Sequence, residues 1–348
     1  MRNLVAGTAL AFALTPAFIG AALTGAAVAQ DYPEMSVRYA NFMPEGFTTS
    51  VIDQFIADEI ARRTDGKVKF EMFHGGTLGG PAEMVELVGA GAVDIGNFPI
   101  GYFFSQFPVA GLADSLPIIF PTAEAAAQIQ KDAYAELEEV SAEFDAANLH
   151  PFLYRGLPQY RLLCTKPVKT LADFDGLKVR TYGTFHPIVF TTFKAVPVNI
   201  ELGEMYEGLQ RGTVDCAYLN YQTAALYNLF EVAKFTSDAE FGATPLYLAY
   251  VNKQVWDGWT PEFKALFDEV VDEAEKKAAD TINAEEAGGL ETLKAKGVEL
   301  VPFEDQEKME AALPDFLDLW VEHLDKAGHG EAAKKHAAFV RERLKSYQ

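Results

Sequence analysis

A predicted strand that ends on an arginine is the most informative feature near the middle of this chain. In the sequence Gly-Leu-Lys-Val-Arg that ends at Arg180, leucine and valine alternate with lysine and arginine, as in a short strand with one buried face. Open α/β sheets bind small ligands at the ends of their strands. We therefore predict that the stretch 176–221 binds a carboxylate. The alternative is that Arg180 makes a structural ion pair with one of the many acidic residues.

The helix and strand that follow the arginine repeat an earlier part of the chain. The residues Glu-Met-x-Glu, Gly-x-Val-Asp of segment 83–94 recur at a constant offset of 121 residues in segment 204–215. Chance does not readily give six identities in twelve positions, although short repeats also arise from a common helix-turn-strand solution. We interpret the two segments as one helix-glycine-strand unit used once in each of two lobes.

The sequence carries no local signature of catalysis or of metal binding. Its six histidines include no pair at His-Glu-x-x-His spacing, and its two cysteines form no Cys-x-x-Cys motif. Neither a Gly-x-Ser-x-Gly elbow nor a dinucleotide-binding Gly-x-Gly-x-x-Gly is present. We predict that the protein is not an enzyme, uses no cofactor and has no metal-ligand residues, while the sequence leaves open whether a metal ion assists ligand binding. The cysteines, Cys164 and Cys216, are either one disulfide or two buried thiols.

The first residues are typical of an exported protein. Arg2 precedes the apolar stretch 4–28, and Ala27-Val28-Ala29 matches a signal-peptidase site, so residues 1–29 are predicted to be a signal peptide. The alternative is a membrane anchor, because the stretch is long enough to span a bilayer. The chain has 29 Lys and Arg against 50 Asp and Glu, a net charge of −21. This balance argues against nucleic acid and anionic membranes as partners.

Hydrophobic periodicity predicts alternating strands and helices along the rest of the chain. The predicted strands are 37–41, 68–73, 93–96, 177–180, 214–215, 246–251 and 298–301. The predicted helices are one capped by Ser50, one over 81–91, one long helix over 122–147, one over 204–212, one over 260–286 that ends before Gly288-Gly289, one over 313–324, and a polar surface helix over 331–344.

Several of these motifs together resemble a known protein family. They are Gly-Leu-Lys-Val-Arg at 176–180, Val-Pro-Val at 196–198, the segment 204–215, Gly-Gly-Thr-Leu-Gly-Gly at 75–80 and Gly-Ala-Val-Asp-Ile at 91–95. Taken in the order of the chain, they resemble the extracytoplasmic solute-binding proteins of TRAP (tripartite ATP-independent periplasmic) transporters. The resemblance implies a periplasmic protein that captures a small organic acid and delivers it to membrane permease subunits. The alternatives are a periplasmic enzyme or a ligand-sensing protein that uses the same cleft.

The resemblance also implies the fold. We expect an α/β, two-lobed periplasmic-binding-protein-like fold with mixed sheets flanked by helices, a ligand cleft between the lobes and a long helix crossing both. Lobe I is predicted at 30–157, with 246–288 returning to it. Lobe II is predicted at 158–245, with 289–348 packing on it and across the hinge. The protein is expected to be a monomer.

Individual site residues follow from the positions that match the family. Arg180 matches the arginine that receives the ligand carboxylate, and Arg161 best matches a second arginine upstream, with Arg155 as the alternative. Asn220 resembles a polar residue after the Val-Asp strand, where Tyr218 and Leu219 compete for the position. The remaining predicted contacts are Asn41, Phe98 with Pro99, Tyr39, Tyr160, Tyr182 and Tyr218. The aromatic residues form either an aromatic pocket or part of the core.

Overall fold

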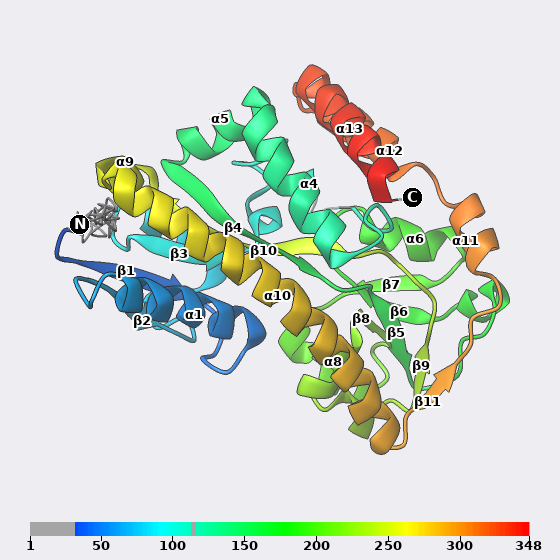
Figure 1. Ribbon diagram of the computed structural model, residues 1–348. Coiled ribbons are helices and arrows are strands. Elements are labelled where there is room, and N and C mark those ends of the chain that lie inside the picture. Colours follow the sequence, from blue (N-terminus) through cyan, green and yellow to red (C-terminus); the bar gives the residue numbers. More distant parts are fainter. Residues whose placement is uncertain (1–31, 113–115, 348) are drawn as a thin grey trace, which may run out of the picture. The chain divides into compact units, whose positions relative to one another are not determined.

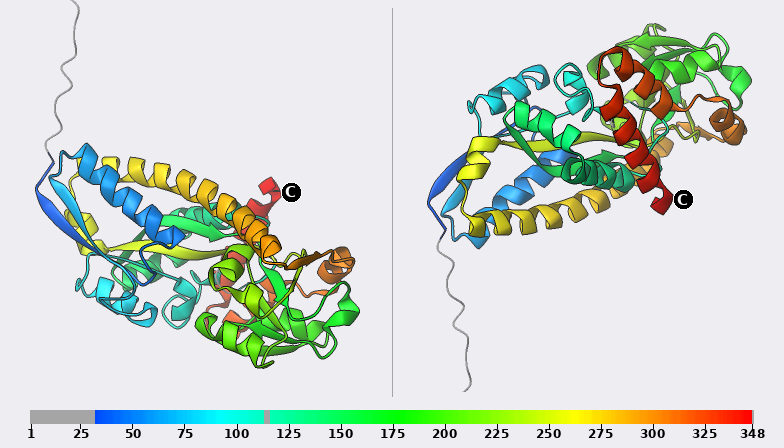
Figure 2. Two further views of the ribbon diagram at one scale, coloured as in Figure 1. Left: turned by 90° about the horizontal axis from the view of Figure 1, so that it is seen from below. Right: turned by 90° about the horizontal axis from the view of Figure 1, so that it is seen from above.

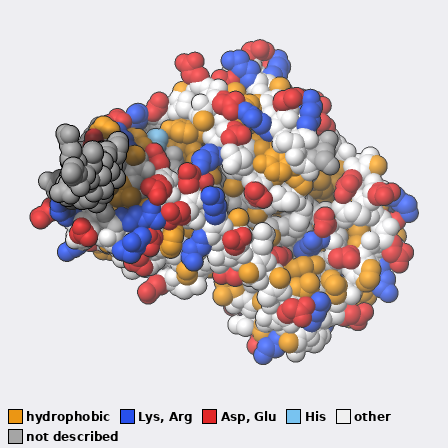
Figure 3. Space-filling model, viewed as in Figure 1, with side chains coloured by type: hydrophobic (Ala, Val, Ile, Leu, Met, Phe, Trp, Pro, Cys, Tyr) orange, Lys and Arg blue, Asp and Glu red, His pale blue; other side chains and the backbone are white. Residues whose placement is uncertain are grey.

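The computed structural model describes residues 32–112 and 116–347 (Figure 1). The predicted signal peptide, residues 1–29, lies outside these ranges. Within the two described ranges, no helix combines the length and the apolar character that a membrane span requires. On the face seen in Figure 3, acidic and basic side chains are intermixed.

The first sheet has five strands in the order β2-β1-β3-β10-β4. These are β1 (Met35–Asn41), β2 (Val68–Phe73), β3 (Ile95–Phe98), β4 (Leu149–Leu157) and β10 (Thr244–Asn252). β1 pairs in parallel with β2 and with β3, whereas β10 runs antiparallel to β3 and β4. The predicted strand 246–251 therefore pairs with strands from the first half of the chain.

The second sheet has six strands in the order β11-β9-β5-β8-β6-β7. These are β5 (Arg161–Cys164), β6 (Lys178–Thr181), β7 (Val196–Asn199), β8 (Cys216–Leu219), β9 (Phe235–Ser237) and β11 (Glu299–Val301). β6 is parallel to β7 and β8, and β5 is antiparallel to β8 and β9. Cys164 and Cys216 face each other across β5 and β8 and form a disulfide, which settles the alternative that the sequence left open.

Helices flank both sheets. They are α1 (Thr48–Arg63), α2 (Met84–Gly89), α4 (Ala123–Glu136), α5 (Glu138–Ala146), α6 (His186–Thr192), α7 (Met205–Gln210), α8 (Tyr221–Leu226), α9 (Lys253–Gly258), α10 (Pro261–Ala295), α11 (Gln306–Ala312), α12 (Phe316–Lys326) and α13 (Gly330–Leu344). Short 3-10 turns precede α2 and α7, at Pro81–Glu83 and Leu202–Glu204.

The repeated segments have the same structure. Each consists of a 3-10 turn, a short helix, a glycine with positive φ and a strand. In each unit the closing aspartate accepts a hydrogen bond from a backbone N–H of the neighbouring parallel strand: Asp94 from Arg38 at 2.7 Å, and Asp215 from Lys178 at 2.9 Å. The carboxylate therefore ties the turn to the next strand in both sheets, which explains why the same residues recur.

Two short segments carry the chain between the sheets, and they pair with each other. Residues 158–160 connect β4 to β5, and residues 238–243 connect β9 to β10. The Tyr160 N–H donates to the Gly242 carbonyl at 3.0 Å, and the Phe241 N–H donates to the Tyr160 carbonyl at 3.2 Å. The views of Figure 2 show α10 running past both sheets alongside these crossings. The two sheets, the flanking helices and the long helix confirm the predicted fold class.

α10 continues through the two glycines that were predicted to follow its end. Gly289 packs directly on α8, where an added Cβ would lie 2.6 Å from the Gln222 backbone, whereas one on Gly288 would meet nothing within 4 Å. The prediction was wrong because Gly289 serves a close approach between two helices, and a packed helix tolerates the propensity cost of glycine.

Three other helix predictions were wrong in detail. The helix predicted over 122–147 is broken at Leu137, whose backbone is extended and whose side chain packs against a hydrophobic core that includes Ile129 and Phe144. Two helices, α4 and α5, therefore bury separate faces. Ser50 does not cap its helix, because α1 already begins at Thr48 after an extended Phe47. α13 is not a purely polar surface helix: it buries one face, including His336, against α12 and α4.

Candidate functional site

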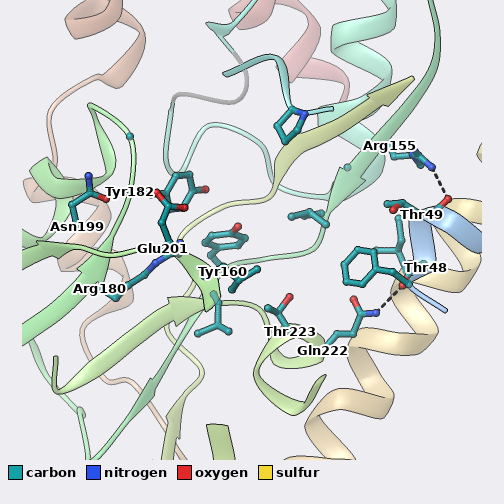
Figure 4. A pocket seen from close by; sticks show the side chains of 18 of the residues that line it. Thr48, Thr49, Arg155, Tyr160, Arg180, Tyr182, Asn199, Glu201, Gln222 and Thr223 are labelled. Atoms are coloured by element: carbon teal, nitrogen blue, oxygen red, sulfur yellow. Dashed lines mark hydrogen bonds between the residues drawn. The ribbon is translucent and has the colours of Figure 1, made fainter. Parts of the chain in front are cut away.

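A cavity of about 300 Å³ is lined by residues that come from both sheets. One wall contains the end of β6 and the loop after β7, and the opposite wall contains the first turn of α1 and the end of β4 (Figure 4). Gln222 and Thr223 of α8 and Ile282 of α10 also belong to the lining. The volume falls at the lower end of the range typical of pockets for small ligands.

Arg180 reaches this cavity from the end of β6. Its side chain is held from behind: Nε donates to the Ile200 carbonyl at 3.1 Å, and one terminal nitrogen donates to the Tyr218 carbonyl at 3.2 Å. The guanidinium lies over the Tyr182 ring, 5.0 Å from its centroid. Only 7% of the residue is exposed, and no carboxylate of the described chain forms an ion pair with it. Because a guanidinium has five N–H donors, Arg180 keeps donors for an anion in the cavity.

Arg155, the second arginine of the lining, is already neutralised. It is 2% exposed, and its guanidinium donates to Asp53 Oδ1 at 2.7 Å and to the Thr49 carbonyl at 3.0 Å. Asp53 is fully buried and also accepts hydrogen bonds from the side-chain amides of Asn41 and Asn97. Since Arg155 has a buried counter-ion and Arg180 does not, the cavity's uncompensated positive charge lies at Arg180.

An aromatic cluster lies behind Arg180. The His186 and Tyr182 rings are 4.3 Å apart, and His186 Nδ1 and the Tyr218 hydroxyl are 3.2 Å apart. Burial, with a smaller contribution from the charge of Arg180, lowers the pKa of His186 to about 3. Burial also raises the pKa of Tyr182 and of Tyr218 well above the ordinary tyrosine value. All three rings are therefore uncharged at neutral pH, and Arg180 carries the positive charge of this wall alone.

Comparison with known proteins shows the family. The model of the bacterial extracellular solute-binding proteins, family 7, matches residues 46–317, which is well over half of the chain. The chain belongs to this family. The match confirms the resemblance that the sequence motifs predicted.

Individual relatives are similar over most of their length. The chain is 29% identical over 281 residues to the 2,3-diketo-L-gulonate-binding periplasmic protein YiaO of Escherichia coli, covering 77% of this chain and 83% of that protein. It is 26% identical over 332 residues to the monocarboxylate 2-oxoacid-binding periplasmic protein all3028 of Nostoc, covering 93% and 89%. The structure of a TRAP periplasmic solute-binding protein from Chromohalobacter salexigens with bound D-glucuronate superposes with a TM-score of 0.75 at 22% identity, covering 88% of this chain and 99% of that one.

Four of the predicted contacts of this solute-binding protein line the cavity: Arg180, Tyr160, Tyr182 and Pro99. Arg161 does not line it. The Arg161 guanidinium donates to Glu240 at 2.9 Å and to the Asp238 carbonyl, beside the segment that crosses between the sheets. Arg155, the alternative to Arg161, is the arginine that lines the cavity.

On the second sheet, neither Asn220 nor Tyr218 is part of the lining, whereas Leu219 is. The Asn220 side chain accepts the Thr223 N–H at 2.8 Å and so caps α8. Tyr218 is fully buried and contributes its carbonyl to Arg180 from behind. Both residues support the wall without facing the cavity.

On the first sheet, Asn41, Phe98 and Tyr39 are also buried behind the lining. Asn41 donates to Asp53 at 2.7 Å, and Phe98 lies in the hydrophobic core, while the following Pro99 reaches the cavity. Asn41 helps to hold the wall in place, because Asp53, to which it donates, is the carboxylate that neutralises Arg155.

Seven polar residues of the lining were not predicted as contacts from the sequence. They are Thr48 and Thr49 in the first turn of α1, Thr184 after β6, Asn199 at the end of β7, Glu201 after β7, and Gln222 and Thr223 on α8. Gln222 Nε2 donates to Thr48 Oγ1 at 2.8 Å, and both also bond to Glu285 of α10. The sequence offered one signal for these contacts, the two threonines Thr48 and Thr49 directly before Ser50. Because the helix was predicted to be capped by Ser50, both threonines were placed outside it.

Proposed function

We propose that this chain is the extracytoplasmic solute-binding subunit of a TRAP transporter. It captures a small organic acid in the cavity and delivers it to the membrane permease. One observation carries the proposal: Arg180 presents a guanidinium with no carboxylate partner among the described residues, while Arg155 nearby is neutralised by Asp53. Hydrogen bonds to charged groups contribute ~1.5–3 kcal/mol each, so a ligand carboxylate at Arg180 gives a substantial part of the affinity.

The proposal also covers properties that the family membership alone leaves open. The protein acts in the periplasm as a monomer after removal of residues 1–29, it binds its ligand without a cofactor or metal ion, and it does not transform that ligand. Its two walls close around the acid by hinge motion at the crossing segments 158–160 and 238–243. The relatives named above support an acid as the ligand, since their names describe proteins that bind a diketo sugar acid, 2-oxoacids and a uronate.

A thermal-shift screen with a matched pair of variants tests the proposal. Purified protein is heated with sugar acids, 2-oxoacids and dicarboxylates, because a ligand at a hundredfold its dissociation constant adds ~2.7 kcal/mol to stability. Arg180→Gln should abolish the shift produced by every stabilising acid. Arg62→Gln, which changes an exposed arginine paired with Glu59 outside the cavity, should leave the shift intact.

Two results would overturn the proposal. One is a screen in which no acid stabilises the wild-type protein, and the other is an Arg180→Gln variant that still responds as the wild type does. Mass spectrometry of the stabilising acid after incubation separates binding from catalysis, since unchanged ligand is expected and a product would favour the enzyme alternative. Arg161→Gln in the same screen tests whether the second predicted arginine contributes to the bound state.

A further inference from the structure

The cavity wall that presents Arg180 also presents a carboxylate. Glu201 is separated from the end of β7 by Ile200 alone, and it lines the cavity together with Asn199 and Tyr182. Figure 4 shows the Glu201 side chain on the Arg180 side of the cavity, next to Tyr182. A ligand carboxylate bound at Arg180 would therefore have a second, negative group of the protein within the same small space.

Glu201 is held in position but is not neutralised. Its backbone N–H donates to Glu204 Oε2 at 3.2 Å, and its side chain takes part in the reciprocal capping box of the 3-10 turn Leu202–Glu204. No lysine or arginine of the described chain forms an ion pair with it, Arg180 included. A carboxylate has about four lone-pair sites, so the capping bond leaves acceptor capacity that faces the cavity.

Besides the ion-paired Arg155, the opposite wall presents uncharged hydrogen-bonding groups. Thr49 is 2% exposed, and its hydroxyl has no hydrogen-bond partner among the residues that the structure describes. Thr48 and Gln222 add a hydroxyl and an amide to the same side. An apolar ligand body would leave the Thr49 hydroxyl without a partner after closure, which is costly for a buried polar atom.

We propose, resting on the proposed function, that Glu201 makes the site selective for a monocarboxylate with several hydroxyl groups. The ligand carboxylate pairs with Arg180, a ligand hydroxyl donates to Glu201, and other hydroxyls bond to the Thr49 wall. A second ligand carboxylate near Glu201 is disfavoured by like-charge repulsion, and a small 2-oxoacid without hydroxyls leaves the buried Thr49 hydroxyl unpaired.

Calorimetric titration with three probes tests this assignment: D-glucuronate, D-glucarate and pyruvate. D-Glucarate has the carbon chain of D-glucuronate with a second carboxylate, so their affinity ratio reports on the charge at Glu201. We expect wild-type protein to bind D-glucuronate at least about tenfold more tightly than either other probe. Glu201→Gln keeps the shape and capping capacity of the side chain and should reduce the D-glucuronate to D-glucarate ratio by about tenfold.

A matched variant separates this local effect from the acidity of the whole chain. Glu207→Gln also removes one negative charge, but Glu207 is exposed, paired with Arg211 and outside the cavity lining, so the ratio should stay as in the wild type. An unchanged ratio in Glu201→Gln, or a wild-type preference for pyruvate or D-glucarate, would overturn the inference. Arg180→Gln distinguishes the two proposals: if it loses every probe while Glu201→Gln changes nothing, the proposed function stands and the Glu201 assignment falls.

Discussion

The buried ion pair between Asp53 and Arg155 makes a sharp prediction about stability. Asp53 is fully buried in α1, and among the described residues the side chains of Asn41, Asn97 and Arg155 all donate hydrogen bonds to it. Arg155 donates to Oδ1 at 2.7 Å, and the amides of Asn41 and Asn97 donate to Oδ2 at 2.7 Å and 2.6 Å. The substitution Asp53→Asn keeps the size of the side chain but replaces one acceptor oxygen with a donor and removes the charge.

The cost of Asp53→Asn follows from what remains in the folded protein. Arg155 keeps its charge with only 2% of the residue exposed, and leaving one partner of a buried pair uncompensated costs ~3–5 kcal/mol. The amide nitrogen introduced by the substitution would also face the side-chain amides of Asn41 and Asn97, which are donors. Asn41 cannot turn its oxygen toward this nitrogen, because that oxygen already accepts the Met43 N–H at 2.8 Å. We expect a loss of about 4 kcal/mol in the free energy of unfolding, a large share of the ~5–15 kcal/mol typical of a folded protein.

Urea denaturation at pH 7, monitored by tryptophan fluorescence, measures this loss. Asp58→Asn is the matched control, because Asp58 lies on the same helix but is exposed and accepts a hydrogen bond from Gln54, so its effect should stay within ~0.5 kcal/mol. In the double variant with Arg155→Met, the uncompensated charge is gone and at least ~2 kcal/mol should be recovered. A cost below ~1 kcal/mol for Asp53→Asn, or a double variant no more stable than the single one, would refute the reasoning.

The remaining predictions concern α10 and α13. Gly289→Ala should destabilise the protein by ~1–3 kcal/mol, because its Cβ would lie 2.6 Å from the Gln222 backbone. Gly288→Ala should stabilise it by ~0.5–1 kcal/mol, because a Cβ there meets nothing within 4 Å. Urea denaturation of both variants measures the difference, and equal effects would contradict the packing argument. Burial lowers the pKa of His336 to about 4, so its contribution to stability is present above its ordinary pKa of 6.5 and is lost as the pH falls toward 4. The variant His336→Gln, which can still donate to the Val109 carbonyl, should remove about 3 kcal/mol of that pH dependence in melts between pH 7 and 4, and a parallel loss in both proteins would contradict it.

Local patterns predicted the elements well where the pattern itself determined the structure. The alternation before Arg180 gave β6, and the repeat of segment 83–94 in segment 204–215 gave two equivalent units whose aspartates make equivalent bonds. Gly289 shows the opposite case. Its neighbour in space is on α8, far away in the sequence, and no local pattern distinguishes a helix-ending glycine from one that allows close packing.

The candidate site was predictable in part for the same reason. The position of Arg180 follows from one short strand, but its freedom to bind an anion depends on its having no ion-paired carboxylate among the described residues, which only the fold determines. Arg155 illustrates this, because its counter-ion Asp53 lies 102 residues away in the chain. Arg161 matches the family spacing, yet the structure pairs it with Glu240, so its contribution to binding stays a prediction.

The long helix α10 explains how the two walls of the cavity are held in one frame. Its Glu275 accepts the N–H of Tyr154 at 3.1 Å, in β4 of the first sheet. Its Glu286 accepts the N–H groups of Tyr221 and Gln222 at 3.0 Å each, at the start of α8, which follows β8 of the second sheet. Burial raises the pKa of both carboxyl groups, while the hydrogen bonds they accept lower it. Because both walls are bonded to the same continuous helix, we expect closure to turn them about α10 rather than to slide them along it. The continuation of α10 past Gly288 adds a further contact to this frame, the close packing of Gly289 on α8.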